Sequence, residues 1–306
     1  MSIFSNGLKT TVMSTELLIE SKVSKKVLFE CLELAREFEA KYSAYKIDSL
    51  LSKINANSGK TPINATKEEL EIFQKALDMA VLSDGAFDPT IGSITQGSYG
   101  FGTSEEKIPS QKELNSKKEL VNYKNIQLTN ESIYLTKKGM RLDLGGIGKG
   151  YVADKIIEHL KLKGATKGLV SVGGEVCSFG KKYNIAIKNP FNDSNIALIK
   201  SSNSELSIST SGDYERYIDS KEHHHILDSK TQLSNHHYSS LTIVQNGRDT
   251  TTLDALATVA FNSKPSELKV LAKKFKVAFF ALTPQKDIII ENFINLDIEG
   301  FELFSL

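Results

Sequence analysis

The order of strand-like and helix-like segments is the feature that most constrains the fold of this chain. Apolar runs typical of strands are grouped rather than separated by helices. After one predicted helix, such runs follow directly upon one another, at 168–179, 183–188, 197–201 and 206–210. Strict alternation of strands and helices would indicate a doubly wound parallel sheet. The grouped strands instead favour an α+β fold with mixed or antiparallel sheets and packed helices.

The first half of the chain is richer in helical patterns. Apolar residues recur at helical spacing from Val27 to Tyr42, and Thr66 and Glu69 form a capping box ahead of a second amphipathic helix. A length of 306 residues fits a single domain, 1–306, or two intimate halves with a cleft between them. Strands are also predicted at 12–20, 125–128, 132–135, 140–144, 241–245, 277–282 and 287–291, helices at 149–162, at 254–261 and from Pro265, and a long loop at 97–118.

The charge of the chain argues against some classes of partner, and its apolar segments bear on the cellular compartment. The net charge is +1 and no basic block is present, so neither nucleic acid nor a membrane surface is expected as a partner. No segment is long enough to span a bilayer, and the start lacks a signal peptide, so we expect a cytoplasmic protein. A leader preceding this sequence would instead imply a periplasmic or membrane-anchored protein. Cys31 and Cys177 are predicted to be two buried thiols.

A glycine-rich turn, 142-LDLGGIGKGYVADKI-156, joins a strand pattern to a helix pattern. A P-loop would need glycine at Asp143 and a hydroxyl at Gly150, and the dinucleotide fingerprint would need glycine at Tyr151. Neither fingerprint is met. The turn still offers backbone N–H groups and a helix N-terminus to an anion, with Lys149 nearby. The alternative is a tight turn with a solvated lysine.

Two further groups of residues suggest chemistry. Asp254 and Thr258 are four residues apart on a predicted helix, so they share a face and could bind Mg²⁺. The alternative is an Asp at the N-cap or in the first turn of the helix, with an ordinary Thr. Three consecutive histidines, His223 to His225, cannot all face one way on an extended segment. A zinc triad is therefore not expected, and we expect one histidine to face a ligand while His223 and His224 are exposed.

In this order, the motifs resemble those of the ApbE family of FAD:protein FMN transferases, from Met13 to Phe261. The 84-DGAFDPTIG-92 loop and the Asp254–Thr258 motif match without a gap, and Leu50, Ser229 and Gln232 depart from the family pattern. The other matches are Met13–Thr15, Ser43–Tyr45 with Asp48, Ser49 and Asn55, Asp143–Gly150, Gly173–Glu175, Thr210–Tyr214, and His225, Ile226, Asp228 and Thr231.

The resemblance implies an ApbE-like fold with an FAD cleft, and Mg²⁺-dependent transfer of FMN from FAD to a Thr or Ser hydroxyl of a target flavoprotein, releasing AMP. The implied metal ligands are Asp254 and Thr258, with backbone carbonyls near Gly146 and Ala257. The residues implied to line the FAD site are Met13, Tyr45, Ala86, Phe87, Asp88, Asp143, Lys149 and Leu227.

The acceptor hydroxyl needs a base, and His225 is the first candidate because its free pKa lies near neutrality. Asp88 is the second. His225 could instead hydrogen-bond the flavin or brace the turn. Two rival functions remain open: a Mg²⁺-dependent FAD pyrophosphatase giving FMN and AMP, and a flavin-binding module without turnover.

Overall fold

The computed structural model describes residues 1–4 and 6–305, and the chain forms two compact units. Unit 1 comprises Met1–Glu37, Ile147–Gly212 and His236–Leu306, and unit 2 comprises Phe38–Gly146 and Asp213–Asn235. Helices are combined with antiparallel sheets, so the predicted α+β class is confirmed. Within the described residues, no helix is both long and apolar enough for a membrane span.

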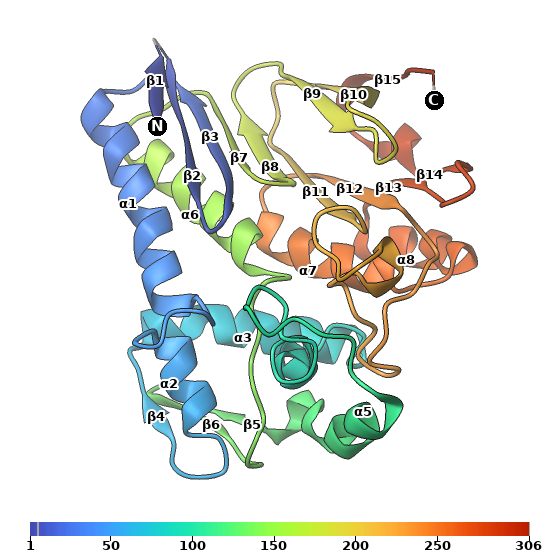
Figure 1. Cartoon of the computed structure of the whole chain (residues 1–306). Helices are drawn as coiled ribbons and strands as arrows, with labels where there is room; N and C mark the ends of the chain where they lie inside the picture. The colour runs from blue at the N-terminus through green and yellow to red at the C-terminus, as the bar shows by residue number, and fades with distance from the viewer. Residues whose placement is uncertain (5, 306) are drawn as a thin grey trace. The chain divides into compact units, whose positions relative to one another are not determined.

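Unit 1 is built on a nine-stranded sheet in which every neighbouring pair is antiparallel (Figure 1). The segment 168–179 forms a hairpin that turns at Gly173 and Gly174. In spatial order the strands are β1 (Ser2–Phe4), β2 (Gly7–Val12), β3 (Thr15–Ser21), β7 (Gly168–Val172), β8 (Glu175–Phe179), β11 (Leu206–Gly212), β12 (Ser240–Asn246), β13 (Ala278–Leu282) and β14 (Ile288–Glu291).

The N-terminal strand prediction was wrong in its boundaries. Instead of one strand over 12–20, β2 and β3 form a hairpin whose turn contains Met13 and Ser14, both at positive φ. Non-glycine residues rarely adopt that conformation, and nothing in the amino-acid types at 13 and 14 demanded it. Met13 therefore lies in a turn and not in a strand.

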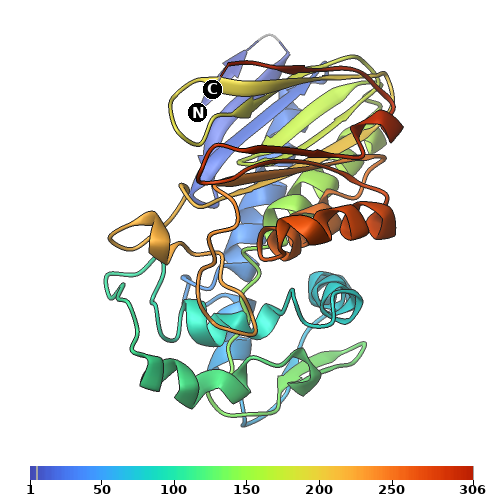
Figure 2. The same ribbon diagram turned by 90° about the vertical axis from the view of Figure 1, so that its right-hand side faces the viewer.

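One face of the large sheet is covered by helices α6 (Gly148–Leu162), α7 (Thr250–Phe261) and α8 (Leu268–Phe275) (Figures 1 and 2). The other face packs on a small sheet of β9 (Asn184–Lys188), β10 (Asn195–Ser201) and β15 (Ile298–Leu303). Side chains alternate between the two faces along β11, and this explains why both faces are covered. Leu206 and Ile208 join the apolar core beneath the small sheet. Ser207 and Ser209 point the other way, and the Ser207 hydroxyl meets the Thr250 hydroxyl at the start of α7. The strand β15 was missed by the sequence analysis.

Unit 2 is mainly helical. It holds α2 (Leu50–Ala56), α3 (Lys67–Leu82), η1 (Pro89–Ile91), α4 (Gly92–Thr95), α5 (Gln111–Lys117), η2 (Lys118–Leu120), η3 (Tyr123–Asn125), η4 (Lys221–His223) and a sheet of β4 (Ile63–Asn64), β6 (Ser132–Leu135) and β5 (Ile126–Leu128). The predicted capping box of Thr66 and Glu69 is confirmed at the start of α3. The chain enters unit 2 inside α1 (Lys25–Tyr42), whose last turn packs Tyr42 against Phe73.

Two secondary-structure predictions in unit 2 were wrong. The 97–118 segment is not all loop, because α5 begins after the Ser110 cap. The 140–144 segment is not a strand, since its hydrogen bonds go to side chains and a loop. Asn55 accepts from the Leu142 N–H and donates to its carbonyl, and the Asp143 N–H donates to the Pro89 carbonyl. These contacts fix the backbone on both sides of Leu142 without a strand partner.

Candidate functional site

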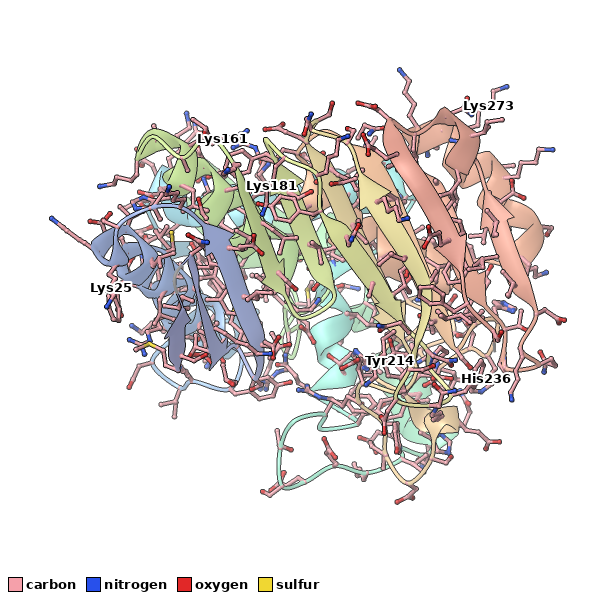
Figure 3. All side chains as sticks on the ribbon, turned by 90° about the horizontal axis from the view of Figure 1, so that it is seen from above. Lys25, Lys161, Lys181, Tyr214, His236 and Lys273 are labelled. Atoms are coloured by element: carbon pink, nitrogen blue, oxygen red, sulfur yellow. The ribbon has the colours of Figure 1, made fainter. Side chains whose placement is uncertain are left out.

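The principal polar cluster of unit 1 joins a lysine to two buried carboxyl groups. Lys149 Nζ lies 2.9 Å from Glu175 Oε1 and 3.1 Å from Asp254 Oδ1. Lys149 is in the first turn of α6, Glu175 is the first residue of β8, and Asp254 lies in the second turn of α7. Figure 3 shows Lys181, just past the end of β8, and His236 toward opposite ends of the strands; Glu175 begins β8 and so lies at the end of that strand away from Lys181.

The glycine after Lys149 brings α6 and α7 into close contact. The Gly150 N–H donates to Asp254 Oδ2 at 2.9 Å. A Cβ atom at Gly150 would lie 2.2 Å from the Thr250 carbonyl oxygen, well inside van der Waals contact. Glycine is therefore required at position 150 by the close packing of the two helices. The P-loop pattern, which has a Ser or Thr at this position, does not explain it.

A second carboxylate also joins these helices, but here α6 supplies the carboxylate and α7 supplies the N–H groups. Asp154, on α6, accepts from the Thr250 N–H at 3.1 Å, the Thr251 N–H at 2.8 Å and the Thr251 hydroxyl at 2.6 Å. Each helix thus has an N-terminal N–H bound by an aspartate of the other, and negative charge at a helix N-terminus is favourable. Asp249 caps α7 and no acidic residue lies in its first turn, so the alternative of an N-cap or first-turn Asp at position 254 was wrong.

The electrostatics of the cluster follow from its burial. Burial, and then the charge of Asp254, raise the pKa of Glu175 to about 8, although Lys149 opposes the shift. Burial lowers the pKa of Lys149, but Asp254 and Glu175 raise it more, so the pKa lies above its usual range and the ammonium stays charged. The Ser209 hydroxyl lies 3.4 Å from Glu175 Oε1. Glu175 Oε2 has no hydrogen-bond partner among the described residues.

The donor chemistry on α7 suits a hard divalent cation. Asp254 and Thr258 are one turn apart on α7, as predicted, and offer carboxylate and hydroxyl oxygens. A carboxylate has about four acceptor positions, so the contacts with Lys149 and Gly150 leave Asp254 able to accept more. Among the described residues, no three His, Cys, Asp or Glu side chains are grouped to hold a metal. A cation on α7 would therefore also need hydroxyl or carbonyl oxygens. Of the expected carbonyl donors, Ala257 lies in α7, and Gly146 is the last residue of the first segment of unit 2.

In unit 2, Asp88 has the contacts of a structural carboxylate. Its Oδ1 accepts from the Thr90 N–H at 2.8 Å and the Thr90 hydroxyl at 2.6 Å, and its Oδ2 accepts from the Tyr123 N–H at 2.8 Å. Burial raises the pKa of Asp88, and these hydrogen bonds oppose the rise. Both oxygens are engaged in holding the 84–92 loop, which favours His225 over Asp88 as the base.

Asp143 and Tyr45 are also tied to their surroundings in unit 2. Asp143 accepts from the Gly145 N–H at 2.8 Å and from the Thr95 hydroxyl at 2.7 Å. Tyr45 is half exposed; its hydroxyl donates to the Phe101 carbonyl at 3.0 Å and accepts from Arg216 Nη1 at 3.2 Å. Arg216 was not predicted as a site residue, although it lies only two residues after the Thr210–Tyr214 motif.

His225 is held in one tautomer by a backbone carbonyl of the segment that pairs with its own through the bridge between Tyr217 and His224. Its Nδ1 lies 3.0 Å from the Arg216 carbonyl oxygen. A carbonyl can only accept, so Nδ1 carries the proton, and Nε2 of the neutral ring is the nitrogen able to take one. His223 and His224 were predicted to be exposed, but His223 is half-buried and His224 is fully buried. His224 Nε2 donates to the Asn235 carbonyl at 2.7 Å. The prediction failed because alternation along the segment turns His224 inward.

The remaining residues expected at the flavin nucleotide differ in exposure. Phe87 is buried, and Ala86 and Met13 are half-buried. Leu227 is 4% exposed and packs in the apolar cluster of unit 2 with Tyr99 and Ile218, so its side chain serves the core. Met13 and Lys149 belong to unit 1, and the others to unit 2.

Comparison with known proteins identifies the family. The model of the ApbE family matches residues 10–281. The chain belongs to the ApbE family. It is 30% identical over 203 residues to the FAD:protein FMN transferase of Klebsiella pneumoniae (strain 342), covering 65% of this chain and 64% of that protein. It is 29% identical to the FAD:protein FMN transferase of Treponema pallidum (strain Nichols), covering 76% of this chain and 70% of that protein.

Solved structures of the family share the whole fold. The ApbE protein of Thermotoga maritima MSB8 is 26% identical, with a TM-score of 0.86 over 96% of this chain and 99% of its own. The flavin transferase ApbE of Vibrio cholerae, at 23% identity, has a TM-score of 0.82 over 94% of this chain and 96% of its own, and it supports the fold alone. The ApbE resemblance seen in the sequence is thereby confirmed, and the Klebsiella and Treponema relatives are FAD:protein FMN transferases.

Proposed function

We propose that this chain transfers the FMN moiety of FAD to a Thr or Ser hydroxyl of a target flavoprotein, releasing AMP, with Mg²⁺ as cofactor. The observation that carries the proposal is the buried cluster of Lys149, Glu175 and Asp254 at the start of α6, in a chain of the ApbE family. A fixed ammonium beside buried carboxyls suits a substrate that brings both a pyrophosphate and a divalent cation.

Lys149 and Asp254 have complementary roles in this proposal. The Lys149 ammonium would pair with phosphate oxygens of FAD, and Asp254 and Thr258 would hold Mg²⁺ with carbonyl oxygens of Gly146 and Ala257. Bound Mg²⁺ would supply charge that offsets the negative charge on the pyrophosphate as its P–O bond breaks. The Gly150 N–H keeps the Asp254 carboxylate oriented without help from a substrate.

His225 is the proposed general base. The acceptor hydroxyl oxygen forms a bond to the phosphorus of the FMN half, and its proton goes to His225 Nε2. The bond from that phosphorus to the bridging oxygen breaks, and the oxygen leaves with AMP together with the electron pair. The hydrogen bond from Nδ1 to the Arg216 carbonyl supports this assignment, because it leaves Nε2 as the basic nitrogen.

The decisive experiment combines the protein with FAD, Mg²⁺ and a folded target domain that carries an acceptor threonine. We expect AMP to form in step with a mass increase of the target by one FMN group, and none on a target whose acceptor is alanine. Free FMN with an unchanged target mass would replace the transferase by a pyrophosphatase. Tight FAD binding without AMP would indicate a flavin-binding module.

The role of His225 is tested by substitution. We expect His225→Ala to lower the rate of flavin transfer by about 10²–10⁴-fold, as loss of a general base does. His236→Ala, at an exposed histidine of unit 1, is the matched control and should keep the wild-type rate. Equal rates for both variants would remove His225 from the mechanism.

A further inference from the structure

Glu175 carries an oxygen that its surroundings do not satisfy. The residue is 1% exposed, and Oε2 has no hydrogen-bond partner among the described residues. A buried carboxylate oxygen left without a partner is costly, and such atoms in native proteins call for a missing water or ion. The other oxygen, Oε1, contacts Lys149 and lies 3.4 Å from the Ser209 hydroxyl.

Two buried carboxyl groups, Glu175 and Asp254, contact the single ammonium of Lys149. That ammonium can balance the charge of only one carboxylate. A divalent cation beside the carboxyl oxygens would allow both groups to be ionised in the interior, where an unbalanced charge is costly.

We propose that Glu175 is a further member of the cation site, giving Oε2 to the coordination shell of the divalent ion held by Asp254 and Thr258. The inference rests on the proposed function only in assuming a divalent cation on α7. Glu175 comes from β8, whereas Asp254 and Thr258 come from α7, so the ion would link the sheet to the helix that packs on it. Mg²⁺ in proteins is usually held by one or two carboxylates, which Asp254 and Glu175 would supply.

The competing explanation is that Glu175 only positions Lys149. A double-mutant cycle separates the two roles, since it isolates the coupling between two side chains. Mn²⁺ replaces Mg²⁺ as the probe, and its affinity is measured without FAD by electron paramagnetic resonance of the unbound ion. The proteins are wild type, Glu175→Gln, Lys149→Met and the double variant, with Glu16→Gln as a control at an exposed carboxylate of the same unit.

We expect Glu175→Gln to weaken Mn²⁺ binding by about 10–100-fold, the usual range for residues around a metal. Lys149→Met should tighten binding, because it removes an ammonium that competes for the same oxygens. In the Lys149→Met background, Glu175→Gln should still weaken binding by a similar factor, and Glu16→Gln should change nothing. Thermal melts confirm folding, and Glu175→Asp serves if Glu175→Gln does not fold: its shorter carboxylate should also weaken binding.

Three results would overturn the inference. A wild-type affinity for Glu175→Gln, or loss of its effect once Lys149 is methionine, would limit Glu175 to positioning the lysine. Absence of Mn²⁺ binding by the wild type would remove the cation site itself. The Mn²⁺ measurement does not depend on flavin transfer. If the chain fails to transfer FMN in the transfer assay, the Mn²⁺ affinities still decide the role of Glu175.

Discussion

Gly150 shows how one missing side chain controls the approach of α6 to α7. Substitution by alanine would place Cβ 2.2 Å from the Thr250 carbonyl oxygen and 2.9 Å from Asp254 Cβ, so α7 must shift. We expect Gly150→Ala to lower the free energy of unfolding by about 1–3 kcal/mol, the usual cost of overpacking. Urea denaturation measures it. Gly300→Ala, whose nearest neighbour would lie 3.7 Å away, should differ little from wild type.

The proposed metal-binding role of Asp254 can be separated from its structural contacts. We expect Asp254→Ala to abolish flavin transfer, because the proposed cation would lose its carboxylate ligand. Lys149 would keep Glu175 as a partner at 2.9 Å, so the ammonium is not left unpaired and the fold should persist. Transfer assays and circular dichroism on the same preparation test this. Turnover at the wild-type rate would show that the metal lies elsewhere.

Residue-level prediction succeeded where the signal is local. The box of Thr66 and Glu69 is contained in four residues, and it is confirmed. The spacing of Asp254 and Thr258 also follows from helix geometry alone. By contrast, the role of Asp154 depends on backbone N–H groups 96 and 97 positions away, and no sequence pattern marks that pairing.

At the scale of elements, the contact of α6 with α7 positions the candidate site. Asp154→Asn keeps the size of the side chain but replaces one acceptor oxygen by a donor that faces Thr251. We expect it to lower the free energy of unfolding by about 1–3 kcal/mol, the cost of an unsatisfied buried group. It should also reduce kcat for transfer more than it changes KM for FAD, because the effect reaches the substrate only through Asp254.

The same logic defines the control for Asp154→Asn. Asp193 is exposed, so Asp193→Asn should leave both stability and kcat unchanged. Should Asp154→Asn lower stability while kcat stays at the wild-type value, the contact between the helices would be purely structural.

Elements were predicted well where apolar periodicity is strong, as in α1 and α6. They were missed where hydrogen-bond partners are distant or are side chains. The 140–144 segment has the alternation of a strand, yet Asn55 and Ser93 satisfy its backbone in place of a neighbouring strand. The β2–β3 turn depends on positive φ at Met13 and Ser14, which residue type does not reveal.

At the scale of the whole molecule, the chain passes repeatedly between its two units, at 37–38, 146–147, 212–213 and 235–236. The first crossing lies within the continuous helix α1, so neither unit can lose that helix alone. We therefore expect one cooperative unfolding transition and not two.

The two cysteines provide the probe for this prediction. Cys31 and Cys177 are buried free thiols, as predicted, and both belong to unit 1. Burial raises the pKa of Cys31 to about 12 and that of Cys177 to about 11. Because the thiolate is the reactive form and burial keeps both thiols protonated in the folded state at pH 8, labelling requires unfolding.

In a urea series at pH 8, thiol labelling reports the opening of unit 1, and circular dichroism reports the helices of both units. We expect the two signals to share one midpoint, with both thiols labelled together. A labelling midpoint at clearly higher or lower urea would mean that unit 1 unfolds on its own. In that case α1 would have to break near Glu37, and a second, independent transition should appear in the helical signal.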